Sequence, residues 1–242
     1  IIMRSLKKSL LLIYIVFGLT ACATSPDANK ADPYEGFNRV VYGFNDGLDK
    51  FLIKPIAQGY QFVTPSVVET GVGNFFSNLG EIRNLANSGL QAKGNKALLH
   101  TGRFLVNTTI GLLGFIDTAH YVGLKKTTSE DFGQTLATWG VGAGPYIVLP
   151  LFGPSTARDS IGFPVDSYLG PVRYVDHVPT RNTLMATNLI DTRAGFLAAE
   201  KLISGDRYVF IRDAYLQSRE FLINDGDVSD SFSGSLQGDG NF

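Results

Sequence analysis

Apolar residues recur at helical spacing through almost the whole body of this chain, and this spacing limits the fold more than any other feature. From Phe37 to Leu52 they step by three and four positions, beginning just after Pro33. The spacing resumes after Thr64, which we expect to cap a helix with Pro65 at its first position. It continues after Gly94, and these stretches predict amphipathic helices.

The second half of the chain follows the same rule. We expect Ser129 to cap a helix that runs to Trp139, and two further helices between Thr180 and Ile223, separated near residues 204–206. Period-two alternation is scarce, and the segment 146–149 is the one credible extended piece. We therefore predict an all-α single domain of several medium and short helices over residues 33–223.

Two features are unusual for an ordinary helical bundle. Several of the 27 glycines fall inside the helical patterns, and each costs about 1 kcal/mol relative to Ala in a helix interior. They are Gly43, Gly71, Gly73, Gly102, Gly111 and Gly114. In addition, residues 104–116 read F-L-V-N-T-T-I-G-L-L-G-F-I, apolar nearly all round. This segment is too short to cross a bilayer, so it is either buried core or a surface that touches acyl chains.

The first 21 residues are typical of a secretory signal peptide. Arg4, Lys7 and Lys8 precede a short apolar run, and the leader ends in Leu-Thr-Ala before Cys22. This ending is similar to the bacterial lipobox, whose cysteine becomes acylated, and Cys22 is the single cysteine of the chain. We expect residues 22–32 to form a lipidated tether that anchors the protein to a membrane without spanning it. The residue that follows the cysteine is Ala23 and not Asp, and in this respect the chain resembles lipoproteins that are sorted to the outer membrane.

The charge distribution excludes nucleic acid as a partner. Without the leader the chain holds 18 basic against 22 acidic residues. The segment 224–242 contains four Asp and no Lys or Arg in a Gly/Ser-rich context, which predicts an acidic disordered tail. The body is therefore neutral, and it has no basic stripe of the kind that nucleic-acid-binding proteins carry.

No arrangement of residues typical of catalysis is evident. His100, His120 and His177 lie far apart without metal-binding spacing, and no nucleophile elbow is present. Ser155 lacks the second glycine of that motif, and we interpret it as the N-cap of a helix containing Arg158 and Asp159. We expect no enzyme, no metal and no cofactor, although a lipid-acting hydrolase and a purely structural lipoprotein stay open as alternatives.

The stretch 139–151, W-G-V-G-A-G-P-Y-I-V-L-P-L, resembles a phosphate-binding loop at first sight. Such a loop requires a strand before it and a helix N-terminus after it. Here a predicted helix precedes, Pro145 follows without an N–H donor, and the third glycine comes one residue early. We reject nucleotide binding and predict a side-chain-poor turn, followed by an apolar arm from Pro145 to Leu151.

Six blocks of sequence are similar to one known family, the VacJ/MlaA lipoproteins. They are D-P-Y-E-G-F-N-R (32–39), K-P-I-A (54–57), R-F-L-V-N-T-T-I-G-L-L-G-F-I-D-T-A (103–119), D-F-G-Q-T-L-A-T-W-G-V-G-A-G-P-Y-I-V-L-P-L-F-G-P-S-T-A-R-D (131–159), D-T-R-A (191–194) and R-D-A-Y-L-Q-S-R-E-F (212–221). The resemblance runs from Asp32 to about Gly226, most of the chain after the leader.

The resemblance implies a ring-like helical body around an amphipathic channel, set in the inner leaflet of the outer membrane. Such proteins remove mislocalised phospholipids from the outer leaflet, pass them to a soluble periplasmic carrier, and associate with trimeric porins. On this basis we assign two sets of residues. The membrane belt is Phe104, Leu105, Leu112, Leu113 and Phe115, and the lipid-path or gate loop is Gly140, Val141, Gly142, Gly144, Pro145 and Tyr146.

Three arginines are candidates to contact a lipid phosphate. They are Arg103, Arg158 and Arg212, and the alternative for the last two is an ion pair with the neighbouring Asp159 or Asp213.

Overall fold

The computed structural model describes residues 32–226. The signal peptide, Cys22, nearly all of the predicted tether and most of the acidic tail lie outside the described residues, so the predictions for them stay predictions. The described part is mainly helical, with one small two-stranded sheet, which confirms the predicted fold class.

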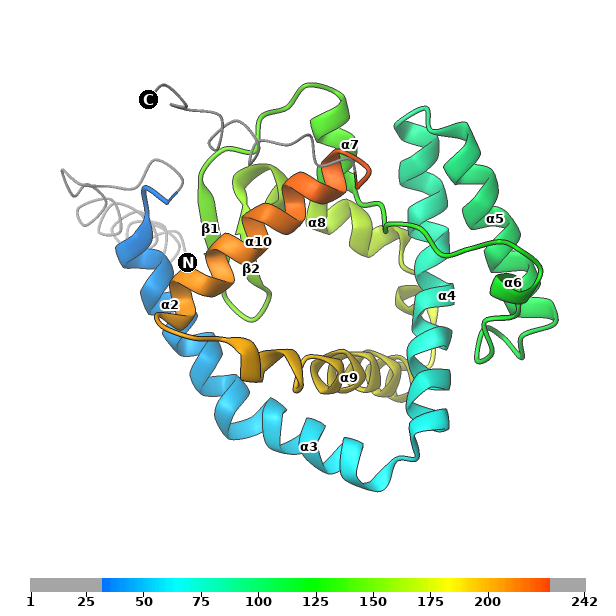
Figure 1. The fold of residues 1–242 in the computed structure, drawn as a ribbon, viewed down its shortest axis with the longest axis horizontal. Helices are drawn as coiled ribbons and strands as arrows, with labels where there is room; N and C mark the ends of the chain where they lie inside the picture. Colours follow the sequence, from blue (N-terminus) through cyan, green and yellow to red (C-terminus); the bar gives the residue numbers. More distant parts are fainter. Residues whose placement is uncertain (1–31, 227–242) are drawn as a thin grey trace, which may run out of the picture.

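The first helices form one continuous rod. Helix α2 (Glu35–Leu48) passes through a π-helical segment, η2 (Asp49–Ile53), into α3 (Lys54–Val63). The backbone N–H of Thr64 donates to the carbonyl of Tyr60, so Thr64 ends α3 and does not cap the next helix. Helix α4 (Ser66–Leu90) instead begins after Pro65, whose fixed φ suits the start of a helix. Figure 1 shows the rod and α4 meeting at a sharp corner.

Helix α5 (Gly94–Thr109) folds back along α4, as the pattern after Gly94 predicts. The apolar segment that follows does not continue the helix. Leu112, Leu113 and Gly114 have φ of 52°, 60° and 94°, so three consecutive residues adopt the left-handed conformation. The carbonyl of Asn107 accepts the N–H of Gly114, which holds this turn closed. Gly111 and Gly114 therefore lie in a turn, and the prediction that they interrupt a helix is wrong.

The next part contains short helices and a hairpin. Helix α6 (Thr118–Tyr121) leads through a loop to α7 (Phe132–Thr138), then to strands β1 (Tyr146–Leu149) and β2 (Gly153–Thr156) and helix α8 (Ala157–Leu169). Two predicted caps are wrong by one or two residues. Asp131, not Ser129, accepts the N–H of Gln134 at the start of α7.

At the start of α8 the cap lies one residue later than predicted: the side chain of Thr156, not that of Ser155, accepts the N–H of Asp159. Ser155 lies in β2, which pairs antiparallel with β1 in the register Tyr146–Thr156 to Leu149–Gly153. The prediction of β1 is confirmed. The sequence Gly-Pro-Ser-Thr of β2 has little β propensity, so local pattern could not reveal the second strand.

The last segments close a ring. After η3 (Pro171–Tyr174) come α9 (Val178–Gly195), η4 (Ala199–Leu202) and α10 (Arg207–Ile223), with the predicted break between the two long helices. Figure 1 shows the rod, α4, α9 and α10 surrounding a common centre, with the hairpin, α7 and α8 beside α10. Side chains join the two ends of the chain: the Tyr208 hydroxyl donates to Asp32, and Arg39 lies 2.8 Å from Asp206.

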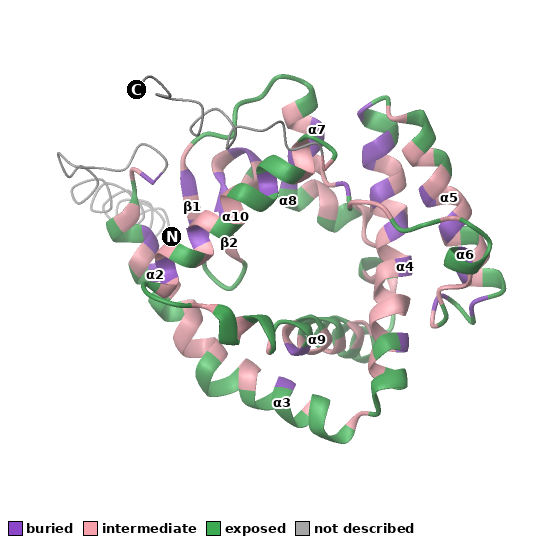
Figure 2. Ribbon diagram, in the orientation of Figure 1, coloured by how far each residue is buried: buried purple, intermediate pink, exposed green. Residues whose placement is uncertain are grey.

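The ring has an unusual distribution of polarity. A small apolar cluster of Val41, Tyr146, Val148 and Tyr208 fixes β1 between α2 and α10. Elsewhere in the described part, most buried side chains are polar or charged, including Glu81, His100, Arg103, Glu130 and Gln134. Figure 2 shows buried residues in short stripes and exposed ones along much of α3 and α9, whereas most of α4 is intermediate or buried. An ordinary water-soluble domain buries its apolar side chains instead.

Candidate functional site

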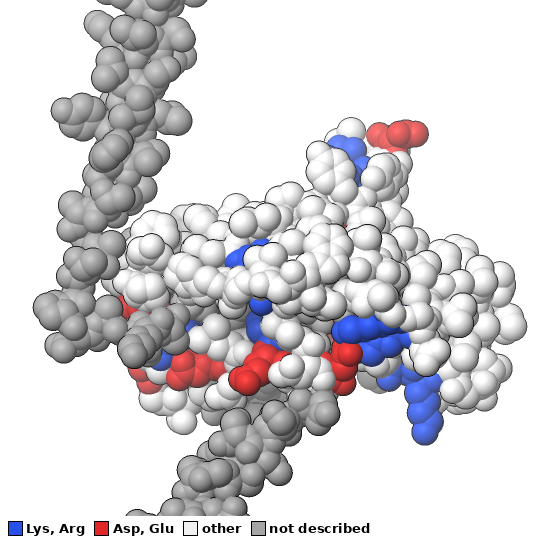
Figure 3. Space-filling view, turned by 90° about the horizontal axis from the view of Figure 1, so that it is seen from above, with Lys and Arg blue, Asp and Glu red and all other residues white. Residues whose placement is uncertain are grey.

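Large apolar side chains cover much of the outside of the ring. Phe51 and Phe62 are 89% and 90% exposed, and Leu98, Tyr121 and Leu202 are each more than 70% exposed. Figure 3, which views the ring from its edge, shows a mainly uncharged surface with most charged side chains in view along one margin. An exposed apolar surface of this extent indicates contact with a membrane or another protein.

The predicted belt residues divide into two groups. Leu105, Leu112 and Leu113 are 55%, 68% and 64% exposed, and the left-handed turn directs the last two outward. Phe104 and Phe115 are half-buried. A Cβ atom at Gly71 would lie 2.1 Å from Cζ of Phe115, so this ring packs directly on the backbone of α4. Phe115 therefore helps to hold the turn on α4, while the three leucines are exposed.

The predicted gate loop joins α7 to β1. Gly140, Val141, Gly142 and Gly144 are exposed, and Gly140 and Gly144 have φ of 87° and 67°, which suit glycine. Pro145 is half-buried at the entry to β1. Tyr146 is 1% exposed, and its ring contacts those of Tyr208 and Tyr215 in the apolar cluster. The loop proper is accessible, whereas Tyr146 attaches it to the core.

Each of the three arginines proposed to contact phosphate has a carboxylate partner inside the protein. Arg158 contacts Asp159 at 3.0 Å, and Arg212 contacts Asp213 at 2.8 Å, as the alternative interpretation predicts. Arg103 lies 2.8 Å from Glu81 and 3.0 Å from Asp117. These three guanidinium groups are structural.

The Arg103 cluster shows how the protein stabilises buried charge. Burial opposes ionisation of Glu81, but hydrogen bonds with His100 and Arg103 outweigh it and lower the pKa of this carboxyl group. Asp117 has a lowered pKa for the same reason, since Asn107 and Arg103 donate to it against the effect of burial. The cluster joins α4, α5 and the segment before α6 through charges that all have partners.

A cavity of about 590 Å³ lies between α4 and α9, and we call it the α4–α9 cavity. Its walls come from four parts of the chain, namely α4, the loop 126–129, the segment from the end of α8 to η3, and α9. Its charged residues are Glu81, Arg83, Lys126, Asp166 and Asp191. The elements that line it also surround the centre of the ring (Figure 1).

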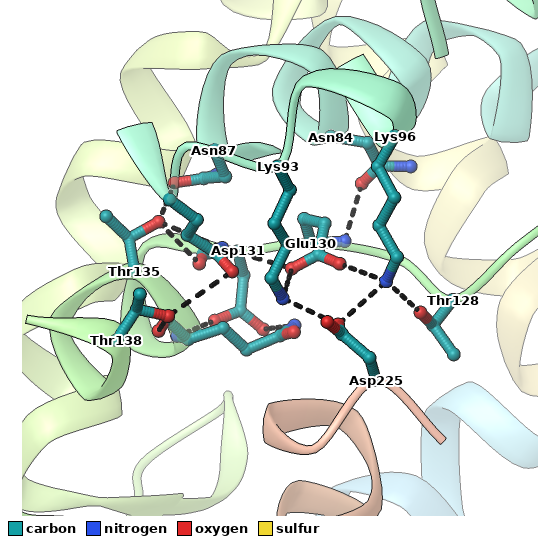
Figure 4. Close-up of polar contacts among 12 residues, drawn as sticks. Asn84, Asn87, Lys93, Lys96, Thr128, Glu130, Asp131, Thr135, Thr138 and Asp225 are labelled. Atoms are coloured by element: carbon teal, nitrogen blue, oxygen red, sulfur yellow. Dashed lines mark hydrogen bonds and ion pairs between the residues drawn. The ribbon is translucent and has the colours of Figure 1, made fainter. Parts of the chain in front are cut away.

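A polar network holds the loop 126–131 on α4 beside this cavity (Figure 4). Glu130 is completely buried, and its carboxylate accepts from Lys96 at 2.8 Å and from Gln91 at 3.0 Å. Its backbone N–H donates to Asn84 on the cavity wall. Lys93 and Lys96 both contact Asp225 just after α10, so the network also attaches the C-terminal end of the described chain.

Neither Arg83 nor the α4–α9 cavity follows from the sequence prediction of the site. One local signal could have indicated Arg83: within α4, none of the positions three or four residues away from it is acidic. Such an arginine has no carboxylate partner along its own helix. The cavity itself depends on α9, which lies about a hundred residues later in the chain.

Two features are absent from the described residues 32–226. This part of the chain contains no helix both long and apolar enough to cross a membrane. It also contains no group of three or more His, Cys, Asp or Glu side chains arranged to hold a metal ion.

The comparisons with known proteins agree on one family. The sequence model described as "MlaA lipoprotein" matches residues 30–222. The chain is 35% identical over 217 residues to the intermembrane phospholipid transport system lipoprotein MlaA of Escherichia coli K12, covering 87% of this chain and 86% of that protein. It is 32% identical to the protein of the same description from Haemophilus influenzae, covering 93% and 94%. An uncharacterized protein of Rickettsia felis is 39% identical over 193 residues, covering 78% and 76%.

A solved structure has the same fold. It was reported under the words "Structural basis for maintenance of bacterial outer membrane lipid asymmetry", and it superposes with a TM-score of 0.71 at 34% identity. The match covers 81% of this chain and all of that one. Fold and surface together define a helical ring that exposes many large apolar side chains and buries mostly polar ones. The chain belongs to the MlaA lipoprotein family.

Proposed function

We propose that this protein is the lipoprotein of an intermembrane phospholipid transport system. It lies in the inner leaflet of a bacterial outer membrane, anchored by acylated Cys22. It removes mislocalised phospholipids from the outer leaflet through the interior of the ring and passes them to a soluble periplasmic carrier. A trimeric porin holds it in the membrane, and the lipid leaves chemically intact, without catalysis.

The observation that carries this proposal is the inverted polarity of the ring. Apolar side chains cost free energy in water, at roughly 25 cal/mol for each Å² exposed, so an outside covered by them is stable in contact with acyl chains. A charged headgroup is costly to place in hydrocarbon, so it needs a polar route. The described part of the chain provides both surfaces, and its helices are too short or too polar to span the bilayer.

The belt and the gate loop have definite roles in this proposal. Leu105, Leu112 and Leu113 contact acyl chains, while Phe115 holds the left-handed turn on α4. The residues 140–145 border the lipid path, and Tyr146 is the fixed point about which the loop moves. The names of the relatives in Escherichia coli and Haemophilus influenzae support phospholipid as the cargo.

The test is to identify the lipid that the full-length protein carries. We expect intact phospholipid in the detergent-purified protein by mass spectrometry, well above the amount in an unrelated outer-membrane lipoprotein purified in parallel. Released fatty acid or free headgroup would instead indicate a hydrolase. No phospholipid above the control would contradict transport and favour a purely structural lipoprotein.

A cellular measurement completes the test. In cells that lack the protein, more aminophospholipid should react with an amine-specific label that cannot cross the outer membrane. Expression of the wild-type chain should reverse this increase. Failure to reverse it, with the protein present in the outer membrane, would contradict the proposed direction of transport.

A further inference from the structure

Three of the residues that α4 contributes to the wall of the α4–α9 cavity are small. Gly73, Ser77 and Gly80 occupy successive turns of the helix on the side that faces the cavity. A Cβ atom added at Gly80 would meet no protein atom within 4 Å. A larger side chain at Gly80, which lines the cavity, therefore has room to project from the helix without a collision at its Cβ.

One turn further on, Arg83 lines the same cavity without a partner. Seven of the other arginines of residues 32–226 that are buried or half-buried have a carboxylate oxygen within 3.0 Å, whereas half-buried Arg181 is in no ion pair with a described residue; the seven are Arg39, Arg103, Arg158, Arg193, Arg207, Arg212 and Arg219. Arg83 makes no side-chain hydrogen bond or ion pair with any described residue, and its Nε is buried. Arg83 is half-buried, and Asp166 of the same cavity acts on it electrostatically without a hydrogen bond. Its guanidinium therefore has donors that are available to an anion from outside the chain.

Further donors face the same space. The loop 126–129 contributes Lys126, together with the hydroxyl groups of Thr127 and Ser129. Lys126 has no ion-pair partner among the described residues. Asn84 uses its Oδ1 to accept the N–H of Glu130, and this leaves its Nδ2 as a donor beside Arg83. A guanidinium, an ammonium, an amide and hydroxyl groups are the donors that bind phosphate oxygens.

The carboxylates of the cavity limit the charge of the ligand. Glu81 is occupied by His100 and Arg103. Asp166 accepts from the N–H of Phe132 and from Asn87, and Asp191 accepts from the Tyr60 hydroxyl, so neither neutralises Arg83 through contact. Two cations facing two carboxylates favour a singly charged phosphodiester over a phosphate dianion, because each added negative charge is repelled.

We infer that the α4–α9 cavity binds the phosphodiester of a phospholipid headgroup, with Arg83 as its main contact and Lys126 as the second. The apolar residues Phe76, Leu79 and Val172 of the same cavity contact the glycerol end of the lipid. This inference rests on the proposed function, since it places a headgroup station within the route through the ring.

The experiment compares variants of the full-length lipoprotein in detergent, with bound phospholipid quantified by mass spectrometry. We expect Arg83→Gln to carry about tenfold less phospholipid than wild type, because a hydrogen-bonded charge is lost. Arg83→Lys should retain more phospholipid than Arg83→Gln, since lysine keeps the positive charge but lacks the bidentate geometry of the guanidinium. Gly80→Leu should also lose lipid by filling the cavity, and it should fold at least as stably because Leu favours helix over Gly.

The matched control is Gly89→Leu, on the same helix. Its Cβ also meets no atom within 4 Å, but Gly89 does not line the cavity, so its lipid content should equal that of wild type. Equal lipid in wild type, Arg83→Gln and Gly80→Leu would overturn the headgroup site while leaving phospholipid transport intact. A wild-type protein without phospholipid would contradict the proposed function instead.

A titration with inorganic phosphate distinguishes a lipid headgroup from free phosphate as the source of the anion. Titration of delipidated protein with phosphate, followed by calorimetry, should give no Arg83-dependent binding up to millimolar concentration. Saturable phosphate binding that Arg83→Gln abolishes would overturn the headgroup assignment in favour of the free anion.

Discussion

Arg103 is 2% exposed, yet it remains charged, because its guanidinium contacts Glu81, Asp117 and the carbonyl of Leu124. A buried ion is tolerated only when its hydrogen-bonding groups have partners. Glu130, Arg158 and Arg219 likewise each contact an opposite charge, although Arg158 Nη2 and Arg219 Nε make no hydrogen bond. Arg83 differs from them because none of its guanidinium nitrogens forms an ion pair with a described carboxylate, and this difference underlies the proposed headgroup site.

Among single residues, Glu200 allows a prediction of how the stability of the fold depends on pH. Burial opposes its ionisation, but hydrogen bonds from Arg193, Lys54 and Arg207 lower its pKa to about 2. An unfolded glutamate has a pKa of about 4.3. The lower value in the folded state means that Glu200 stabilises the ring fully above about pH 4.3, and that this stability is lost as the pH falls towards about 2.

We therefore expect Glu200→Gln to lower the free energy of unfolding by about 2 kcal/mol at pH 7, because three cations lose their common partner. The difference from wild type should shrink between pH 4.5 and pH 2. Circular dichroism of thermal unfolding in detergent measures it. Glu35→Gln is the control, since this carboxylate is 39% exposed and pairs with Arg39 at the surface. A difference that does not change with pH would contradict the assignment.

At the scale of elements, the two irregular segments are built differently. The turn 110–117 is held by Asn107, Asn78 and Phe115, and it keeps two leucines in the left-handed conformation. The loop 140–145 is rich in glycine, and hydrogen bonds attach Val141 to Leu136, Ala143 to Arg158 and Pro145 to Ala157. Gly142 lies between these attached positions, so the proposed gate movement would have to occur there.

Gly142 is the position that tests this difference. A Cβ there meets nothing within 4 Å, and its φ is not in the left-handed region, so Gly142→Val should fold normally while stiffening the loop. Gly144→Val is a poorer test because φ is 67° and the new Cβ would lie 2.9 Å from that of Ala157. We expect Gly142→Val to increase outer-leaflet aminophospholipid in labelled cells without changing the melting temperature.

Gly47→Val on α2 is the matched control for this change, because its Cβ also meets no atom within 4 Å. It should leave lipid labelling at the wild-type level. If Gly142→Val transported lipid normally, the loop would be a connection between α7 and β1 and no gate.

At the scale of the whole molecule, the chain forms a closed ring. The N-terminal rod meets α10 through Asp32, Arg39, Tyr208 and Arg212, and meets α9 through Arg193 and Asp49 at 2.7 Å. Two-stranded pairing of β1 and β2 adds a short rigid piece between α7 and α8. Exposed apolar side chains lie on several elements of this ring, among them Phe51, Phe62, Leu98 and Leu202.

The prediction for the whole molecule concerns its attachment to the membrane through Cys22. We expect Cys22→Ala to keep residues 1–21, since cleavage at a lipobox follows acylation of the cysteine. The variant should therefore retain the precursor mass by mass spectrometry and be lost from the outer-membrane fraction. A Ser25→Ala variant is the control and should be processed normally. A cleaved Cys22→Ala protein in the outer membrane would contradict the lipobox assignment.

The sequence by itself determined the local structure and the family. Apolar spacing predicts the long helices, Tyr146–Leu149 predicts β1, and the blocks around residues 103–119 and 131–159 identify the family. These features depend on neighbours three or four residues apart, or on contiguous motifs, so no knowledge of the fold is needed. Cap positions were wrong at Ser129 and Ser155 because a better acceptor stands one or two residues later.

Only the tertiary structure decided which side chains face which environment. Glu81 pairs with Arg103 across two helices, Glu200 joins three elements, and Arg83 faces α9 with no partner. Each of these outcomes involves at least one distant residue: Arg103 lies 22 positions from Glu81, and Lys54 lies 146 positions from Glu200. The polarity of a helix face is visible in the sequence, but whether that face meets lipid, protein or a cavity is decided by the closure of the ring.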